Sequence, residues 1–166
     1  MILVYKNCSD AFLPKYSTNQ SACFDIHACL VPGEQVSRRG LSNIAHTVTV
    51  TEERSVIVGP HHRILIPTGL IFHIPENHSL RLHPRSGLSF KDGICLANCE
   101  GVVDEDYTDP VFVALLNTSG VPFIIHHGDR ICQAEIVRDV RSEIVEVDVK
   151  PIKDSNRVGG FGSTGK

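Results

Sequence analysis

The 166-residue sequence has no hydrophobic run long enough to span a membrane, and its N-terminus lacks the basic-then-apolar pattern of a signal peptide. We therefore expect a soluble, intracellular protein that makes no membrane contact. Strong charge is also missing, since the formal net charge is only −3, which argues against a broad nucleic-acid-binding surface. Tryptophan is absent and methionine occurs once. A chain of this length suits one domain with a substantial core.

Several common site motifs are missing as well. None of the six cysteines forms a C-x-x-C pair, so the sequence offers neither a zinc knuckle nor a redox motif. The cysteines are scattered through apolar, strand-like stretches, and we expect them to be buried free thiols. There is no P-loop, and neither a Ser/His/Asp triad nor a metal-ligand spacing stands out.

The hydrophobic pattern predicts β-structure almost throughout the chain. Short β-branched or alternating stretches, separated by Gly, Pro and Asn turns, predict strands at residues 47–51, 55–58, 63–66, 70–74, 79–83, 111–115 and 145–149. Only Ser89–Gly93 could form a short helix. Residues 34–55 are more polar and are interpreted as an inserted arm or an extra hairpin. Many short strands at near-regular spacing favour a sandwich or barrel.

Two loop segments carry residues suited to phosphate chemistry. Pro84-Arg85-Ser86-Gly87-Leu88 is either a strand ending in a glycine turn or an anion-binding nest, with guanidinium, hydroxyl and free backbone donors. Asp104-Glu105-Asp106-Tyr107 is either a solvated hairpin tip or a catalytic turn. Because Asp104 directly follows Val102-Val103, we expect it at a strand end with reduced solvation, where its carboxylate could orient and deprotonate a water.

Two further segments place charged residues beside apolar ones. Asp25 occupies an apolar position of the strand-like stretch 21–26, either as a satisfied core carboxylate or facing a cation. Arg130 follows a Gly-Asp turn, and one of its two interpretations is a structural pair with an internal carboxylate such as Asp25 or Asp129, the other being a functional role. Simple alternation predicts that Gln133 shares the face of Ile131, opposite Arg130.

The last eleven residues, 156–166, contain four glycines, one aromatic ring, two hydroxyls and two cations. Such a segment cannot bury enough apolar surface to fold on its own. A disordered tail is one interpretation. The other is a phosphate clamp, in which glycine amides, hydroxyls and a guanidinium bind an anion and Phe161 covers a ring.

Five segments in order resemble the trimeric deoxyuridine triphosphatase (dUTPase) family. The first contains Asp25, and the other four read PRSGLSFKDGI at 84–94, LAN with GVVDEDY between 96 and 107, GDRICQ at 128–133 and GGFGSTG at 159–165. The resemblance implies an all-β, jelly-roll-like subunit with at most one short helix, comprising a domain at 1–155 and a flexible lid at 156–166. It also implies a homotrimer with three sites at subunit interfaces. The implied reaction hydrolyses dUTP to dUMP and pyrophosphate with Mg²⁺, which cleans the nucleotide pool and supplies dUMP.

The resemblance also assigns roles to single residues. Asp104 matches the carboxylate that activates water at the α-phosphorus. Asn98 and the backbone of Val102 and Val103 match the uracil-binding hairpin, and Tyr107 matches the ring packed on deoxyribose. Arg130 is implied to be structural, and Asp25 to reach the metal only through water. The implied phosphate and lid contacts are Arg85, Ser86, Gly87, Gln133, Arg157, Phe161, Gly162 and Ser163.

The chain departs from the family pattern in places. Asn156 stands where the tail arginine is expected, and Arg157 follows one position later. Thr108-Asp109-Pro110 replaces the usual residues after the tyrosine. Two other functions stay open from sequence alone: a dCTP deaminase-related enzyme of the same fold, which would release ammonia, and a non-catalytic trimer that binds a nucleotide or a protein.

Overall fold

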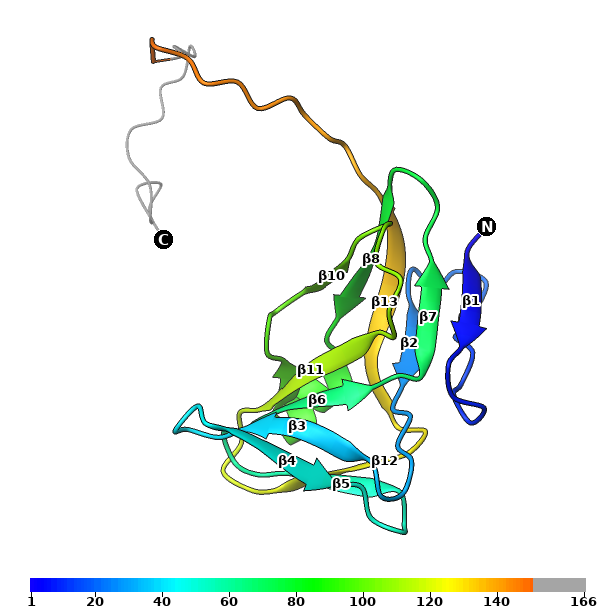
Figure 1. Ribbon diagram of the computed structural model, residues 1–166, viewed down its shortest axis with the longest axis vertical. Helices are drawn as coiled ribbons and strands as arrows, with labels where there is room; N and C mark the ends of the chain where they lie inside the picture. The colour runs from blue at the N-terminus through cyan, green and yellow to red at the C-terminus, as the bar shows by residue number, and fades with distance from the viewer. Residues whose placement is uncertain (151–166) are drawn as a thin grey trace.

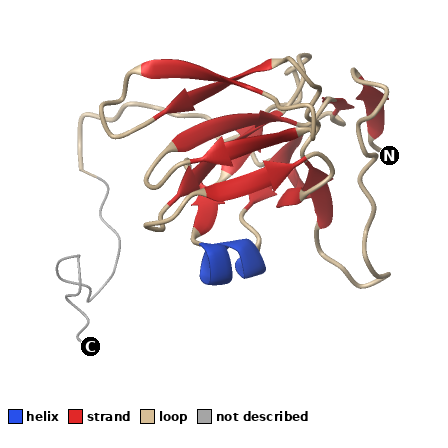
Figure 2. Ribbon diagram, turned by 90° about the horizontal axis from the view of Figure 1, so that it is seen from below, coloured by secondary structure: helices blue, strands red, loops and turns tan. Residues whose placement is uncertain are grey.

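The computed structural model describes residues 1–150. The strands of this part of the chain are β1 (Leu3–Lys6), β2 (Phe24–His27), β3 (Gln35–Arg39), β4 (Ala45–Thr49), β5 (Ser55–Val58), β6 (Arg63–Pro67), β7 (Leu70–His73), β8 (His78–His83), β9 (Ile94–Leu96), β10 (Gly101–Val103), β11 (Phe112–Asn117), β12 (Phe123–His126) and β13 (Arg130–Arg138). The one helical element in this range is the π-helical turn η1 (Leu88–Asp92), seen at one end of the molecule in Figure 2.

The strands form antiparallel sheets packed around one hydrophobic core (Figures 1 and 2). One sheet has the strand order β10-β8-β13-β2, and the other has the order β4-β3-β6-β11-β9. Two small sheets, β1-β7 and β12-β5, complete the described fold. The predicted all-β architecture with a single short helix is therefore confirmed.

Period-two alternation explains which residues enter the core. In β11, Val113 and Leu115 are buried while Phe112 is exposed, and β6 buries Ile64 and Ile66 beside it. The polar segment 34–55 forms the β3–β4 hairpin, which extends the five-stranded sheet because Arg38 and Arg39 pair with β6. The hairpin interpretation of this segment is therefore correct.

The strand predicted at residues 145–149 is wrong for the described chain. Residues 140–150 form no strand, and Val145, Val147 and Val149 are exposed. Figure 1 shows this segment running away from the sheets after β13. Alternation marks a sequence that suits a half-buried strand, but a strand also needs a neighbour to hydrogen-bond, and no strand of residues 1–150 supplies one.

The cysteines of the described chain are free thiols, as expected. Burial raises the pKa of Cys132 to about 12, so this thiol stays protonated and inert. Cys29 is also buried, whereas Cys99 is exposed in the turn before β10, contrary to the expectation of uniform burial. No helix in residues 1–150 is long and apolar enough to cross a membrane.

Candidate active site

The hairpin that leads from β9 into β10 carries the predicted base-binding residues. Asn98 is exposed in its turn, and Val102 is 49% exposed on β10. β10 lies close against β8: a Cβ built on Gly101 would sit 2.9 Å from the Cβ of Leu82, so only glycine fits. β10 is also an edge strand, which leaves backbone N–H and C=O groups on its outer side available to a ligand.

A cavity of about 330 Å³ opens beside this hairpin. It is lined by Leu65, Val102, Val103, Asp104, Tyr107, Val111 and Phe112. Apolar walls with a few polar groups are typical of a small-molecule site. The structure thus brings four predicted site residues together, and it adds Leu65, Val111 and Phe112. Sequence reasoning missed these three because they are ordinary apolar residues, in β6, in β11 or directly before β11, whose contact with the site depends on sheet pairing.

Asp104 lies directly after β10, at the edge of this cavity. The expected strand-end position is confirmed, but the expected loss of solvation is wrong for the single chain, because Asp104 is exposed. Its backbone carbonyl accepts a hydrogen bond from the N–H of Tyr107 at 3.2 Å. The Tyr107 hydroxyl donates to the carbonyl of Pro110 at 3.1 Å, which holds the ring near the cavity.

Glu105 anchors the acidic turn and was not predicted as a site residue. Its carboxylate accepts the N–H of Asn77, from the β7–β8 turn, and an Arg141 N–H at 2.8 Å. The hydrogen bond from Arg141 and then the one from Asn77 lower the pKa of Glu105. Glu105 therefore stays charged and fastens the turn, while the carboxylates of Asp104 and Asp106 are left exposed.

A second group of predicted residues surrounds Asp25 on β2. Arg85 donates from Nε to Oδ1 at 3.0 Å, and Arg130 donates from Nη1 to Oδ2 at 3.3 Å. Arg85 also donates to the carbonyl of Arg130 at 3.1 Å. The predicted pairing of Arg130 with Asp25 is confirmed. Arg85 is oriented by the same carboxylate.

The face predicted for Gln133 is wrong because of an irregularity in β13. The register shifts between Arg130 and Cys132, so Ile131 and Cys132 are both buried. Gln133 instead lies opposite Asp25, on the same face of the sheet as the Arg130–Asp25 pair. Its side chain donates to the carbonyl of Pro84 at 3.1 Å, which connects it to the loop that carries Arg85.

Ser86 and Gly87 follow this loop, where they lie exposed in helical conformation directly before η1. Gly87 has a φ of −63°, and a Cβ built on it would meet nothing within 4 Å. The fold of the described chain therefore does not need glycine here. The space it leaves suits a ligand that approaches the backbone closely.

Gly87→Ala should accordingly leave the thermal unfolding midpoint unchanged. The added methyl should raise the Kd for a nucleoside triphosphate about tenfold, because overpacking at a contact costs roughly 1–3 kcal/mol. Calorimetric titration with a non-hydrolysable dUTP analogue measures this effect. An unchanged Kd would reject the phosphate contact that the resemblance implies for Gly87.

Asp25→Ala should lower the free energy of unfolding by about 2 kcal/mol, since two charge-assisted hydrogen bonds are lost. The Asp25 side chain is only 17% exposed, so these contacts are worth more than a surface pair. Urea denaturation at fixed protein concentration tests this, with Glu52→Ala, an exposed residue, as the control. Equal midpoints for the two variants would contradict it.

The described residues provide no cluster of three or more His, Cys, Asp or Glu side chains that could hold a metal ion. Both Asp25 oxygens already accept guanidinium hydrogen bonds, so direct ligation there is disfavoured. Mg²⁺ keeps several waters and is commonly bound through substrate phosphates. A magnesium ion at this site would therefore have to be held by substrate phosphates, with Asp25 in contact with it only through water.

The two residue groups lie on one sheet but not in one cavity. Val102 lies on β10, Gln133 on β13 and Asp25 on β2 of this sheet. Arg85 lies shortly after β8 of the same sheet. The cavity beside the hairpin is lined by none of the Asp25 cluster. The predicted tail residues Arg157, Phe161, Gly162 and Ser163 lie outside the described residues.

Together, the fold and site define an all-β protein with an acid-bearing hairpin cavity and a separate arginine–carboxylate cluster. A sequence model of the dUTPase family matches residues 49–165. The chain is 37% identical to the deoxyuridine 5'-triphosphate nucleotidohydrolase of Finegoldia magna, over 96% of this chain and 95% of the relative. The corresponding enzyme of Nautilia profundicola is also 37% identical, over 95% and 93%. The chain belongs to the dUTPase family.

Solved structures show the same fold. A mutant dUTPase of Staphylococcus bacteriophage 80alpha, determined with dUpNHpp, has a TM-score of 0.77 at 19% identity, covering 99% of this chain and 98% of its own. The dUTPase of Streptococcus mutans has a TM-score of 0.65 at 19% identity, covering 86% and 98%. At these identities the likeness concerns the fold alone.

Proposed function

We propose that this protein hydrolyses dUTP to dUMP and pyrophosphate, and so removes dUTP from the nucleotide pool and supplies dUMP. Membership of the dUTPase family carries the proposal, and the placement of Asp104 in the wall of the hairpin cavity supports it. The Asp104 carboxylate accepts a proton from a water whose oxygen attacks the α-phosphorus. The bond from the α-phosphorus to the oxygen bridging to the β-phosphorus breaks, and pyrophosphate leaves.

In this proposal the β10 hairpin recognises the base. The free edge of β10 offers backbone donors and acceptors to uracil, and Asn98 adds a side-chain amide. Cytosine would reverse one donor–acceptor pair and leave buried groups unpaired, which can lower kcat/KM by about 10⁴-fold or more. Tyr107, which lines the same cavity, is assigned to pack its ring on deoxyribose and disfavour a 2′-hydroxyl.

The phosphates are assigned to Arg85, Ser86, Gly87 and Gln133, with Arg130 and Asp25 holding Arg85 in position. Bound magnesium would neutralise charge on the triphosphate. Among the structural neighbours, a mutant dUTPase of phage phi11 of S. aureus is described as revealing the coordination of a structural Mg(II) ion. For this chain magnesium is a proposal that rests on its membership of the dUTPase family.

We assign the active unit to a homotrimer with shared sites. The separation of the hairpin cavity from the Asp25 cluster supports this, because one chain leaves the two halves apart. The exposed valines of residues 140–150 support it as well, since a neighbouring subunit could pair with this segment. Residues 156–166 are proposed to close over the bound nucleotide, with Phe161 on the base and Arg157 replacing the usual tail arginine.

The products of a nucleotide assay test the reaction. We expect pyrophosphate from dUTP in the presence of Mg²⁺, and little product from dCTP or dTTP. Ammonia released from dCTP would instead identify a deaminase. Tight dUTP binding without any product would identify a non-catalytic nucleotide-binding protein.

A further inference from the structure

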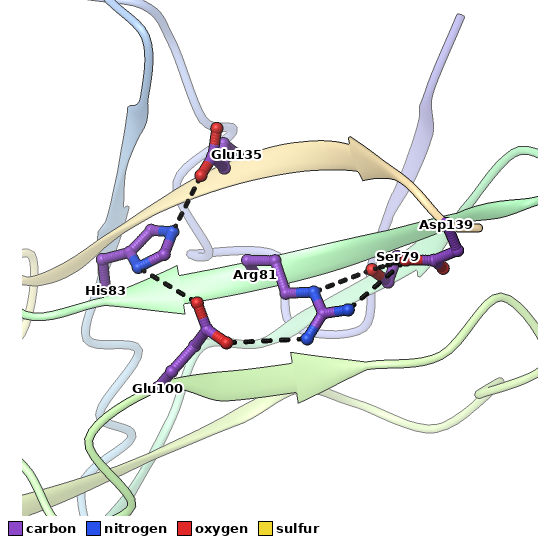
Figure 3. Close-up of polar contacts among 6 residues, drawn as sticks. All are labelled: Ser79, Arg81, His83, Glu100, Glu135 and Asp139. Carbon is purple, nitrogen blue, oxygen red and sulfur yellow. Dashed lines mark hydrogen bonds and ion pairs between the residues drawn. The ribbon is translucent and has the colours of Figure 1, made fainter. Parts of the chain in front are cut away.

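Glu100, the residue just before β10, belongs to a polar network on the sheet face away from the core (Figure 3). Its carboxylate lies 3.5 Å from Nη1 of Arg81 and 3.6 Å from Nδ1 of His83. Arg81 and His83 both come from β8, the strand that pairs with β10. Glu100 therefore connects the hairpin turn to the neighbouring strand through side chains.

The two β8 residues are themselves held from the other side by β13 and the residue after it. His83 lies 3.1 Å from Glu135 through Nε2, and Arg81 lies 3.3 Å from Asp139 through Nη2. Ser79 joins the second contact, since it accepts from Arg81 and donates to Asp139, both at 2.9 Å. Arg81 and His83 are thus held in position by residues other than Glu100. They can therefore restrict the position of the Glu100 carboxylate (Figure 3).

The backbone next to Glu100 adopts an unfavourable conformation. Cys99 has a φ of 62°, in the left-handed region that residues with a Cβ avoid. The N–H of Glu100 donates to the carbonyl of Asn98 at 2.6 Å, which closes a tight turn around Cys99. Such a conformation persists only where its surroundings enforce it. Within the turn of residues 97–100, Glu100 is the residue whose side chain forms ion pairs with the neighbouring strand.

We propose that Glu100 is a positioning residue, which holds the turn so that Asn98 and the β10 edge are presented to the base. The proposal rests on the proposed function, because it concerns the same nucleotide site. Glu100 needs no contact with substrate for this role. Glu100 acts by stabilising the left-handed conformation of Cys99. This mechanism can be distinguished experimentally from a general loss of folding stability.

Glu100→Ala should raise both the Kd for a non-hydrolysable dUTP analogue and the KM for dUTP about tenfold, because the turn is then free to leave its left-handed conformation. It should change kcat by less than about threefold, since Asp104 and its water are untouched. Glu100→Gln, which keeps the side chain's volume, serves as a second variant if the alanine variant folds poorly. Glu53→Ala, an exposed acid in the β4–β5 turn, should leave every value unchanged.

The decisive test is a double variant that contains Cys99→Gly. Glycine adopts a positive φ without strain, so Cys99→Gly combined with Glu100→Ala should restore Kd and KM to within about threefold of wild type. Failure of this rescue, or an unchanged Kd in Glu100→Ala, would overturn the positioning role. Analogue binding is measured without turnover, so an inactive wild type that still binds would reject the hydrolysis and leave the positioning test intact. A wild type that does not bind would reject both.

Discussion

Asp104→Asn should lower kcat for dUTP hydrolysis by about 10²–10⁴-fold, the range expected when a general base is lost. Asparagine keeps the shape of the side chain but cannot accept the proton of the attacking water. The Kd for a non-hydrolysable dUTP analogue should stay within about threefold of wild type, since the cavity walls are unchanged. Steady-state kinetics and calorimetric titration together separate these two effects.

Asp106→Asn is the matched control, because Asp106 is an exposed acid of the same turn. It should retain kcat within about threefold of wild type. Comparable losses in both variants would point to the net charge of the turn rather than to one base. Full activity in Asp104→Asn would reject the assignment of Asp104 altogether.

Two inactive variants should regain activity when they assemble together. Asp104→Asn lacks the base, and a chain ending at residue 155 lacks the proposed lid, so each alone should turn over dUTP poorly. Coexpressed in equal amounts, they should recover up to about a quarter of wild-type activity. In a randomly mixed trimer, the chain that supplies the acid to a site has Asp104 in about half of the cases. The different chain that supplies the lid has the lid in about half of the cases, so about a quarter of the sites are complete.

The recovery depends on sites shared between chains. If each chain supplied its own acid and its own lid, no mixed assembly would contain a complete site, and activity would stay at the sum of the two variants. Sedimentation must show trimers in all three samples. A monomeric wild type with full activity would contradict the shared-site proposal directly.

The shortened chain should also keep its melting temperature, and a large loss would show that residues 156–166 are structural.

Much of the fold could be predicted because period-two alternation and turn residues are local signals. The strand at Ser55–Val58 has the predicted bounds, and β6 differs by one residue. The segment 145–149 has the same alternation but forms no strand in the described chain, because pairing requires a partner that local sequence does not specify. The irregularity in β13 escaped prediction for a related reason, since it shifts the register without any glycine or proline to mark it.

The candidate site was predictable in its residue types and less so in its contacts. Motif order predicted Asp104, Arg85 and Gln133 as site residues, and the expected Arg130–Asp25 pair is present. The motif roles assigned Arg85 to phosphate and did not indicate that it shares the same carboxylate, a contact that the fold forms across 60 positions of the chain. Glu100 and Glu105 were overlooked, since each looks like a solvated turn residue until its arginine partner from another segment is known.

The most direct test of the proposed reaction is hydrolysis of dUTP in ¹⁸O-labelled water, with the label located by mass spectrometry. Attack by an Asp104-activated water on the α-phosphorus places ¹⁸O in the phosphate of dUMP and leaves the pyrophosphate unlabelled. Label in the pyrophosphate with unlabelled dUMP would show attack at the β-phosphorus, and would contradict the proposed role of Asp104.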